Sequence, residues 1–272
     1  MKLIEAAKTQ IHQVLDRFGF SLIRKGRSNL DWFYPVPVNC EISQVPFFLE
    51  LFFGQRGDGV FIEVGGYDGY NYSNTYGLAQ RGWKGYLIEP DPIQFEECRR
   101  RYRHHPNVTV SNCAISDGTR DTLQLTRGGL ITTSNSEQAQ AYRETQHFCE
   151  MITEETFSAE ACSLDKYLQD HEVASEPEVI VVDVEGATAD VFAGFSLARW
   201  RPKMLIVELF DLHPTLSATR SADLAVRRQI LGSGYETIHR DSINSIFVRQ
   251  DVVDATVSGT NSGELCGESN RH

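Results

Sequence analysis

Residues 61–69 have the sequence Phe61-Ile62-Glu63-Val64-Gly65-Gly66-Tyr67-Asp68-Gly69, an apolar run that leads into a glycine-rich turn. Glycine is needed in such a turn because the chain bends sharply and its backbone must approach a ligand without a Cβ in the way. The stretch therefore predicts a strand, a tight turn and a nucleotide-shaped site. The glycines alone do not distinguish a dinucleotide from S-adenosylmethionine.

Short apolar runs alternate with helical patterns from Val60 onward, and this alternation is typical of βαβ units. We expect an α/β fold with a mostly parallel twisted sheet, helices on both faces and an antiparallel hairpin at the end. The expected strands are Val60–Val64, Tyr86–Glu89, Val108–Ala114, Val179–Val184 and Leu205–Leu209, then the hairpin Tyr235–His239 and Ser245–Arg249. The expected helices are Asn74–Arg81, Ile93–His104 and Ala187–Phe195.

Three segments flank or interrupt this pattern. Residues 1–46 combine an amphipathic helix over 2–18 with a proline-rich connector, and the helix has three interpretations: a homodimer contact, a membrane-surface helix, or packing on its own domain. Within the main domain, 47–250, a polar insert over 127–161 predicts a lid or substrate wall, with Gln138–His147 as its best helical segment. Residues 251–272 are poor in large apolar side chains, which predicts a disordered tail.

Composition restricts the partners and the compartment. The formal net charge of −11 over 272 residues disfavours nucleic acid as a substrate, because it repels a phosphate backbone. The six cysteines are widely spaced, with no metal-like pairing with histidine, which indicates reduced thiols. No apolar run has the length of a transmembrane segment and the first residues do not resemble a signal peptide, so we expect a cytoplasmic location.

Two acids favour S-adenosylmethionine over a dinucleotide. Glu63 precedes the glycines inside the strand, where a buried carboxylate needs partners such as loop N–H groups or the methionine ammonium, and where it would repel a pyrophosphate. Glu89 ends the next strand, where Rossmann-type sites place an acid that accepts hydrogen bonds from ribose hydroxyls. The structural alternatives are a core ion pair for Glu63 and a helix-capping role for Glu89.

Several motifs together resemble the FkbM-type methyltransferases. They are Phe61–Gly65 with Asp68-Gly69, Ser73-Asn74-Thr75, Gly82–Pro90, Ser163–Leu168 and Val182–Ala187, and they extend from about residue 60 to residue 210. The resemblance implies a Rossmann-like methyltransferase fold and methylation of a hydroxyl on a sugar, glycan or polyketide-like natural product. One departure is Gly66, where many relatives carry alanine.

The resemblance adds Ser73 and Asn74 to the cofactor contacts and places Asn112, Ala114 and Ile115 near the adenine. The full set of expected S-adenosylmethionine contacts is Glu63, Gly65, Gly66, Tyr67, Asp68, Gly69, Ser73, Asn74, Glu89, Pro90, Asn112, Ala114, Ile115 and Asp183.

The reactive end of the site is expected at the carboxyl ends of the later strands, where ligands bind in open α/β sheets. A hydroxyl acceptor must lose its proton, and His213 or Asp183 is the candidate base, with Glu208 beside them. The alternative for Asp183 is to hold the ammonium group of the cofactor. His213 has a structural alternative as a loop histidine that caps backbone near Pro214. A Mg²⁺ site is a less favoured option, formed by Asp183, Glu185, Glu208 and Asp211.

The main competing enzyme class is an oxidoreductase that uses NAD or a nucleotide sugar. A non-catalytic module that binds the cofactor is the third reading.

Overall fold

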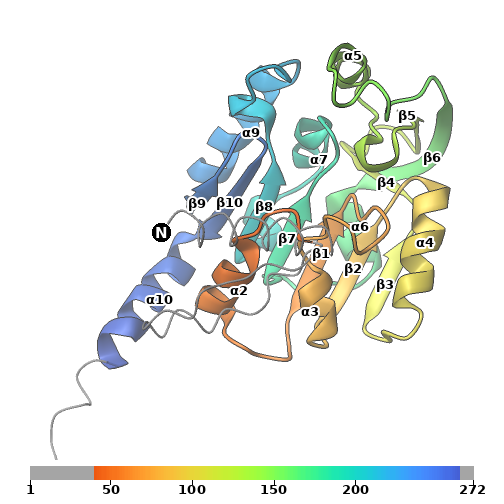
Figure 1. Cartoon of the computed structure of the whole chain (residues 1–272). Helices are drawn as coiled ribbons and strands as arrows, with labels where there is room; N and C mark the ends of the chain where they lie inside the picture. The colour runs from red at the N-terminus through yellow and green to blue at the C-terminus, as the bar shows by residue number, and fades with distance from the viewer. Residues whose placement is uncertain (1–39, 264–272) are drawn as a thin grey trace, which may run out of the picture.

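The computed structural model describes residues 40–263, which form an α/β fold around a seven-stranded sheet in the order β3-β2-β1-β7-β8-β10-β9 (Figure 1). The first five of these strands are parallel, and β10 runs antiparallel to both β8 and β9. The expected parallel sheet with an antiparallel terminal hairpin is thereby confirmed. The strands are β1 Val60–Val64, β2 Lys84–Ile88, β3 Val108–Ser111, β7 Val179–Val182, β8 Met204–Glu208, β9 Tyr235–Arg240 and β10 Asn244–Arg249.

Helices cover both faces of this sheet because successive strand residues point to opposite sides. On β1, Ile62 and Val64 belong to one buried cluster with α6–α9, whereas Phe61 belongs to a second cluster with α2, α3, α4 and α10. The helices are α2 Val45–Phe53, α3 Tyr76–Gln80, α4 Pro92–Tyr102, α6 Leu164–Asp170, α7 Thr188–Ala193, α8 Leu197–Trp200, α9 Arg220–Gly232 and α10 Gln250–Gly263.

The expected strand Val108–Ala114 is in fact two strands. β3 ends at Ser111, and β4 (Ala114–Ser116) joins a separate three-stranded sheet in the order β4-β6-β5, with β5 at Thr122–Thr126 and β6 at Thr156–Ser163. Asn112 lies at the break, where its side chain donates hydrogen bonds to the carbonyl oxygens of Glu89 and Pro90. A side chain that binds neighbouring backbone in this way competes with the strand ladder.

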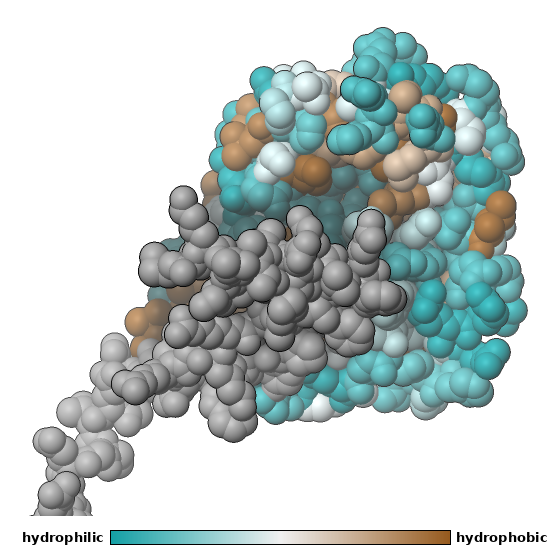
Figure 2. Space-filling view, viewed as in Figure 1, coloured by the Kyte–Doolittle hydropathy of each residue, from teal (hydrophilic) through white to brown (hydrophobic). Residues whose placement is uncertain are grey.

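The insert begins as expected after β5 but ends earlier, because residues 156–161 belong to β6. It contains the 3₁₀ helix η2 (Gly129–Ile131) and the helix α5 (Ser136–Glu144), in place of the expected helix Gln138–His147. Asn135 starts α5 two residues earlier, since its side chain accepts the N–H groups of Glu137 and Gln138. The insert packs through Tyr142 against Phe210 and Leu216, above the end of the sheet (Figure 1). Hydrophobic residues also gather around the upper part of the view in Figure 2, where the outer surface is otherwise mostly hydrophilic.

The expectation of disorder from residue 251 is wrong for the described part of the tail. Residues 250–263 form α10, whose Val252 and Val253 pack against the core cluster that includes α2. Both valines are partly buried, so the helix makes apolar contact with the core although its composition is otherwise polar. Residues 264–272 lie outside the described residues, as do the helix expected over 2–18, its proposed dimer contact and the connector up to residue 39. No helix within residues 40–263 combines the length and apolarity that a membrane crossing requires.

Candidate active site

The glycine-rich turn follows β1 directly and lies at the carboxyl end of the parallel strands. The backbone N–H groups of Gly65 and Gly66 both donate to the carbonyl oxygen of Ile88, at 3.0 Å. Gly65 has a φ of 88°, and a Cβ there would lie 1.7 Å from the carbonyl oxygen of Asp183, so only glycine fits. At Gly66 the nearest atom to an added Cβ is Leu87 Cβ at 3.4 Å, an ordinary contact. The turn therefore has room for an alanine at position 66, the residue that many FkbM-type methyltransferases carry there.

Glu63 is buried below this turn, and polar groups of the following loop satisfy it. It accepts hydrogen bonds from Thr75 Oγ1 at 2.7 Å, Ser73 Oγ at 3.0 Å and the backbone N–H of Asn74 at 3.1 Å. Burial raises the pKa of Glu63 to about 7, against the effect of these donors. Glu63, Ser73 and Asn74 thus form a polar support that fixes the loop behind the turn.

Asp68 and Gly69 shape the same loop. The Asp68 carboxylate accepts the backbone N–H groups of Tyr70 and Asn71, both at 2.8 Å, and pairs with Arg101 at 3.2 Å. Gly69 has a φ of 74° and leaves no room for a Cβ beside Cys98 and Tyr102. These contacts give both residues a structural function in the loop.

Glu89 lies at the end of β2 and faces the turn from the neighbouring strand. It accepts the backbone N–H groups of Tyr67 and Asp91, both at 2.8 Å. Burial raises the pKa of Glu89 to about 8. A carboxylate oxygen has two lone pairs, so these bonds leave acceptor capacity for a ligand hydroxyl.

A cavity lies between these strand ends, the second sheet and the insert. The expected cofactor residues that line it are Gly65, Tyr67, Glu89, Pro90, Ala114, Ile115 and Asp183. The remaining expected contacts, which its lining does not include, are Glu63, Gly66, Asp68, Gly69, Ser73, Asn74 and Asn112.

Other lining residues were missed by the sequence analysis. Leu123 and Leu125 come from β5, and Leu130, Thr132 and Ser134 come from the insert. Leu123 and Leu125 alternate with polar residues, which predicts a half-buried strand. Nothing in the local sequence shows that this strand faces the cofactor side.

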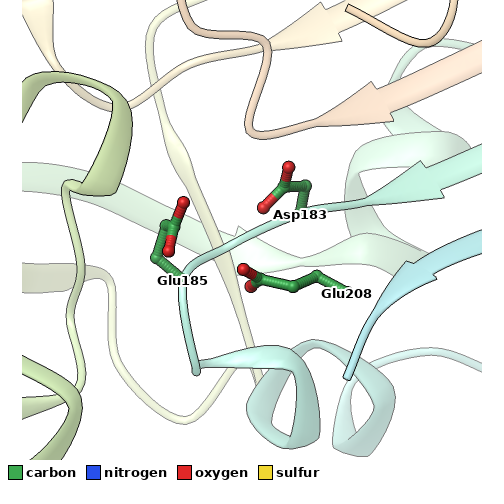
Figure 3. Close-up of side chains that lie close together, drawn as sticks. All are labelled: Asp183, Glu185 and Glu208. Carbon is green, nitrogen blue, oxygen red and sulfur yellow. The ribbon is translucent and has the colours of Figure 1, made fainter. Parts of the chain in front are cut away.

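Three carboxyl groups meet beside the cavity, two from the loop after β7 and one from the end of β8 (Figure 3). Asp183 and Glu185 line the cavity, whereas Glu208, expected at the reactive end of the site, is absent from its lining. Asp183, Glu185 and Glu208 each offer one oxygen, and these oxygens lie within 4.8 Å of one another. Asp183 Oδ1 is buried without a hydrogen-bond partner, whereas Glu208 accepts the N–H of Gly186 at 3.3 Å. Burial, reinforced by the neighbouring carboxylates, raises the pKa values of Asp183 and Glu208 well above their usual range and that of Glu185 to about 8.

Two further residues of this region carried no sequence signal. Tyr142, on α5, places its hydroxyl on the Glu185 carboxylate, so the insert contacts the acidic group directly. Glu41, ahead of α2, accepts the side-chain amides of Asn244 at 2.7 Å and Asn74 at 3.1 Å. Both contacts join segments far apart in the chain, which local patterns do not reveal.

Asp211 and His213 do not join the acidic group. Asp211 forms ion pairs with Arg227, at 2.6 Å, and with Arg240, and these pairs explain why it is buried. His213 Nδ1 accepts the backbone N–H of Leu216 at 2.8 Å, and its side chain is absent from the cavity lining. Burial lowers the pKa of His213. This geometry matches the loop-capping alternative for His213, and it separates Asp211 from the expected metal ligands.

Comparison with known proteins identifies a sequence family. A model of the methyltransferase FkbM domain matches residues 63–236. No curated protein sequence matches the chain significantly.

Solved structures similar in fold include three at a TM-score of 0.43. An O-methyltransferase from Bacillus cereus in complex with SAH is 12% identical, with 90% of this chain and 91% of that chain covered. A putative O-methyltransferase from Klebsiella pneumoniae is 9% identical, with coverage of 91% and 94%. A human methyltransferase 10 domain containing protein is 11% identical, with coverage of 90% and 96%.

Proposed function

Because the chain belongs to the FkbM methyltransferase family, we propose that it transfers the methyl group of S-adenosylmethionine to a hydroxyl of a sugar, glycan or natural product. One observation carries the choice of a hydroxyl acceptor. Asp183 lines the cavity and keeps a buried carboxylate oxygen without a hydrogen-bond partner. Such an oxygen is able to receive the hydrogen bond and the proton of an incoming hydroxyl.

The cofactor would extend from Glu89 to Asp183. Glu89 and Pro90 line the cavity beside Ala114 and Ile115, an arrangement suited to ribose hydroxyls next to the flat apolar adenine. The methionine portion would then lie beside Gly65 and Asp183. Glu63, Ser73 and Asn74 would act indirectly, by holding the loop that approaches the cofactor.

The reaction is an in-line displacement. S-adenosylmethionine would supply the methyl group, whose carbon–sulfur bond would break as the acceptor oxygen bonds to the methyl carbon, and Asp183 would take the hydroxyl proton. His213 is less suited to this step because Leu216 already donates to its Nδ1, the lone pair that a base would use. The alternative task for Asp183 is to hold the methionine ammonium, as the sequence analysis left open.

The acceptor would enter from the side of the insert, where Leu130, Thr132 and Ser134 line the cavity. Leu130 provides an apolar surface, and Thr132 and Ser134 each provide a hydroxyl, which together suit a neutral acceptor. The nearby carboxylates would repel an anionic acceptor. We also propose a cytoplasmic location, supported by the unpaired cysteines Cys40, Cys98, Cys113, Cys149 and Cys162.

The experiment has two stages. First, a thermal-shift comparison should show stabilisation by S-adenosylhomocysteine and none by NAD, since only a ligand that binds the folded state raises its melting temperature. Stabilisation by NAD alone would support the oxidoreductase alternative.

Second, a mass-spectrometric screen of sugars and natural products should reveal a methylated product. Asp183→Asn should lower its rate by ~10²–10⁴, the usual effect of losing a general base. Asp190→Asn, on the exposed side of α7, is the matched control and should retain the wild-type rate. Cofactor binding with no product from any acceptor would favour the non-catalytic alternative, and weakened cofactor binding by Asp183→Asn would assign Asp183 to the ammonium.

A further inference from the structure

We propose that Asp183, Glu185 and Glu208 form a binding site for one divalent cation that prefers oxygen ligands, such as Mg²⁺ or Mn²⁺. The site itself is inferred from geometry and charge, while its use in orienting the acceptor hydroxyl rests on the proposed function. The site differs from the expected metal option, because Asp211 is occupied by Arg227 and Arg240.

The spacing of the three carboxylates suits a single ion. Two oxygens bound to the same cation lie at most twice the metal–oxygen distance apart, which is about 4.2 Å for Mg²⁺ and about 5.2 Å for Ca²⁺. The oxygens of Asp183, Glu185 and Glu208 lie within 4.8 Å of one another, so small side-chain movements would bring them around one ion (Figure 3). Carboxylate oxygens are the ligands that these cations prefer.

The acidic group lacks a compensating charge within the described residues. Arginine and lysine side chains there pair with other acids, for example Asp68, Asp91 and Asp211, and none forms an ion pair with Asp183, Glu185 or Glu208. Carboxylates this close cannot all be ionised without a cation among them. The sulfonium and ammonium of S-adenosylmethionine are opposed by its own carboxylate, so the cofactor adds a net charge of only about +1.

Two incompletely satisfied polar side chains, one within the acidic group and one beside it, point to a ligand. One is Asp183, whose Oδ1 is buried without a partner. The other is Gln138 on α5, which is fully buried and contacts the Tyr142 phenol, and whose amide atoms have no other hydrogen-bond partner within the described residues.

The Gln138 side chain lies against Gly186, where an added Cβ would be 2.8 Å from Gln138 Cγ. It therefore borders the loop that carries Glu185. Buried polar groups in native proteins are normally satisfied by protein, water or ions. A partly hydrated cation would supply a charge for Asp183 and bound water for Gln138, since Mg²⁺ usually keeps several of its waters.

The test measures metal binding without turnover. Full-length protein, freed of metal with a chelator and dialysed, is titrated with Mn²⁺ and followed by electron paramagnetic resonance, and with Mg²⁺ by calorimetry. We expect one site, with Mg²⁺ displacing Mn²⁺. Glu208→Gln and Glu185→Gln should each weaken Mn²⁺ binding at least about tenfold, because each removes a charged ligand.

Asp190→Asn, whose side chain is exposed on α7, serves as the control and should bind Mn²⁺ as the wild type does. Thermal melting of every variant shows whether it is folded, and two independent ligand variants keep the test decisive if one is not. A wild type with no bound Mn²⁺ or Mg²⁺ at millimolar concentration would overturn the proposal, as would folded Glu208→Gln and Glu185→Gln that bind with unchanged affinity.

The two proposals fail in different ways. A protein that binds S-adenosylhomocysteine and methylates its acceptor in excess EDTA would exclude the metal site as a functional element and retain the methyltransferase. A protein that binds Mn²⁺ through these carboxylates but does not bind S-adenosylhomocysteine would retain the metal site and exclude the methyltransferase proposal.

Discussion

Gly65 and Gly66 are adjacent in the turn, yet the structure constrains them differently. At Gly65 a side chain would require a left-handed backbone and would collide with the Asp183 carbonyl oxygen, 1.7 Å from the added Cβ. We therefore expect Gly65→Ala to destabilise the fold by at least about 1–2 kcal/mol and to abolish binding of S-adenosylhomocysteine. Gly66→Ala meets only an ordinary contact at 3.4 Å and should keep both properties. Chemical denaturation and calorimetry measure the two effects, and equal behaviour of the variants would contradict this account of the turn.

Glu63, which holds the loop behind the turn, also makes the free energy of unfolding depend on pH. Its pKa is raised from 4.5 to about 7 in the folded protein, so the folded state holds a proton that the unfolded chain releases. The associated stability is fully present below about pH 4.5 and is lost as the pH rises through about 7. Glu63→Gln, which does not titrate, should reduce the loss of unfolding free energy between pH 5 and pH 7.5 by about 1–3 kcal/mol.

Urea denaturation at the two pH values measures this difference. Glu236→Gln, on an exposed position of β9, is the control and should show the wild-type loss. If Glu63→Gln lost as much stability as the wild type, the buried carboxyl would not be the group that titrates.

At the level of elements, α10 shows how little apolar surface a terminal helix needs. Val253 packs against the core cluster that includes α2, whereas Ala255 is exposed on the same helix. We expect Val253→Asp to lower the free energy of unfolding by about 1–3 kcal/mol, because it places a charge against apolar side chains. Ala255→Asp introduces the same charge in solvent and should change stability by less than about 0.5 kcal/mol. Thermal and urea unfolding of the two variants distinguish a docked helix from a tail that contributes nothing to stability.

The insert couples a second element to the site. Its helix α5 contacts Glu185 through Tyr142, while its first turn contributes Leu130 to the cavity. The insert therefore borders both the acidic group and the space left for the acceptor. The lid or substrate wall expected from the sequence stays a prediction, which the contribution of insert residues to the cavity lining supports.

For the whole molecule, we expect the net charge of −11 to make nucleic acid an unfavourable partner, because it repels a phosphate backbone. Arg99 and Arg100, in the basic stretch of α4, are already paired with Glu96 and Glu97, which reduces the positive field that this stretch presents. We expect no increase in the fluorescence polarisation of a labelled single-stranded RNA at about 50 mM salt, where electrostatic binding is stronger than at physiological salt. Binding that weakens steeply with added salt would instead reveal a cationic surface that the described residues do not provide.

The sequence by itself determined most of the fold and the family. The apolar runs of β1, β7 and β8, the glycines after β1 and the hairpin turn are local features, because strand period and backbone sterics act over a few residues. Glu89 and Asp183 could likewise be placed at strand ends from their position after apolar runs, and Glu63 could be placed inside the strand ahead of the glycines.

Only the tertiary structure decided which partner each polar side chain has. It paired Asp211 with Arg227 and Arg240, and it committed the Nδ1 of His213 to the loop at Leu216. It brought Tyr142 onto Glu185 from another part of the chain, and left Asp183 Oδ1 with no partner. The physical reason is that a hydrogen bond or ion pair depends on separations of a few ångströms between segments that the fold brings together. Such separations follow from the packing of whole elements, and no local periodicity encodes them.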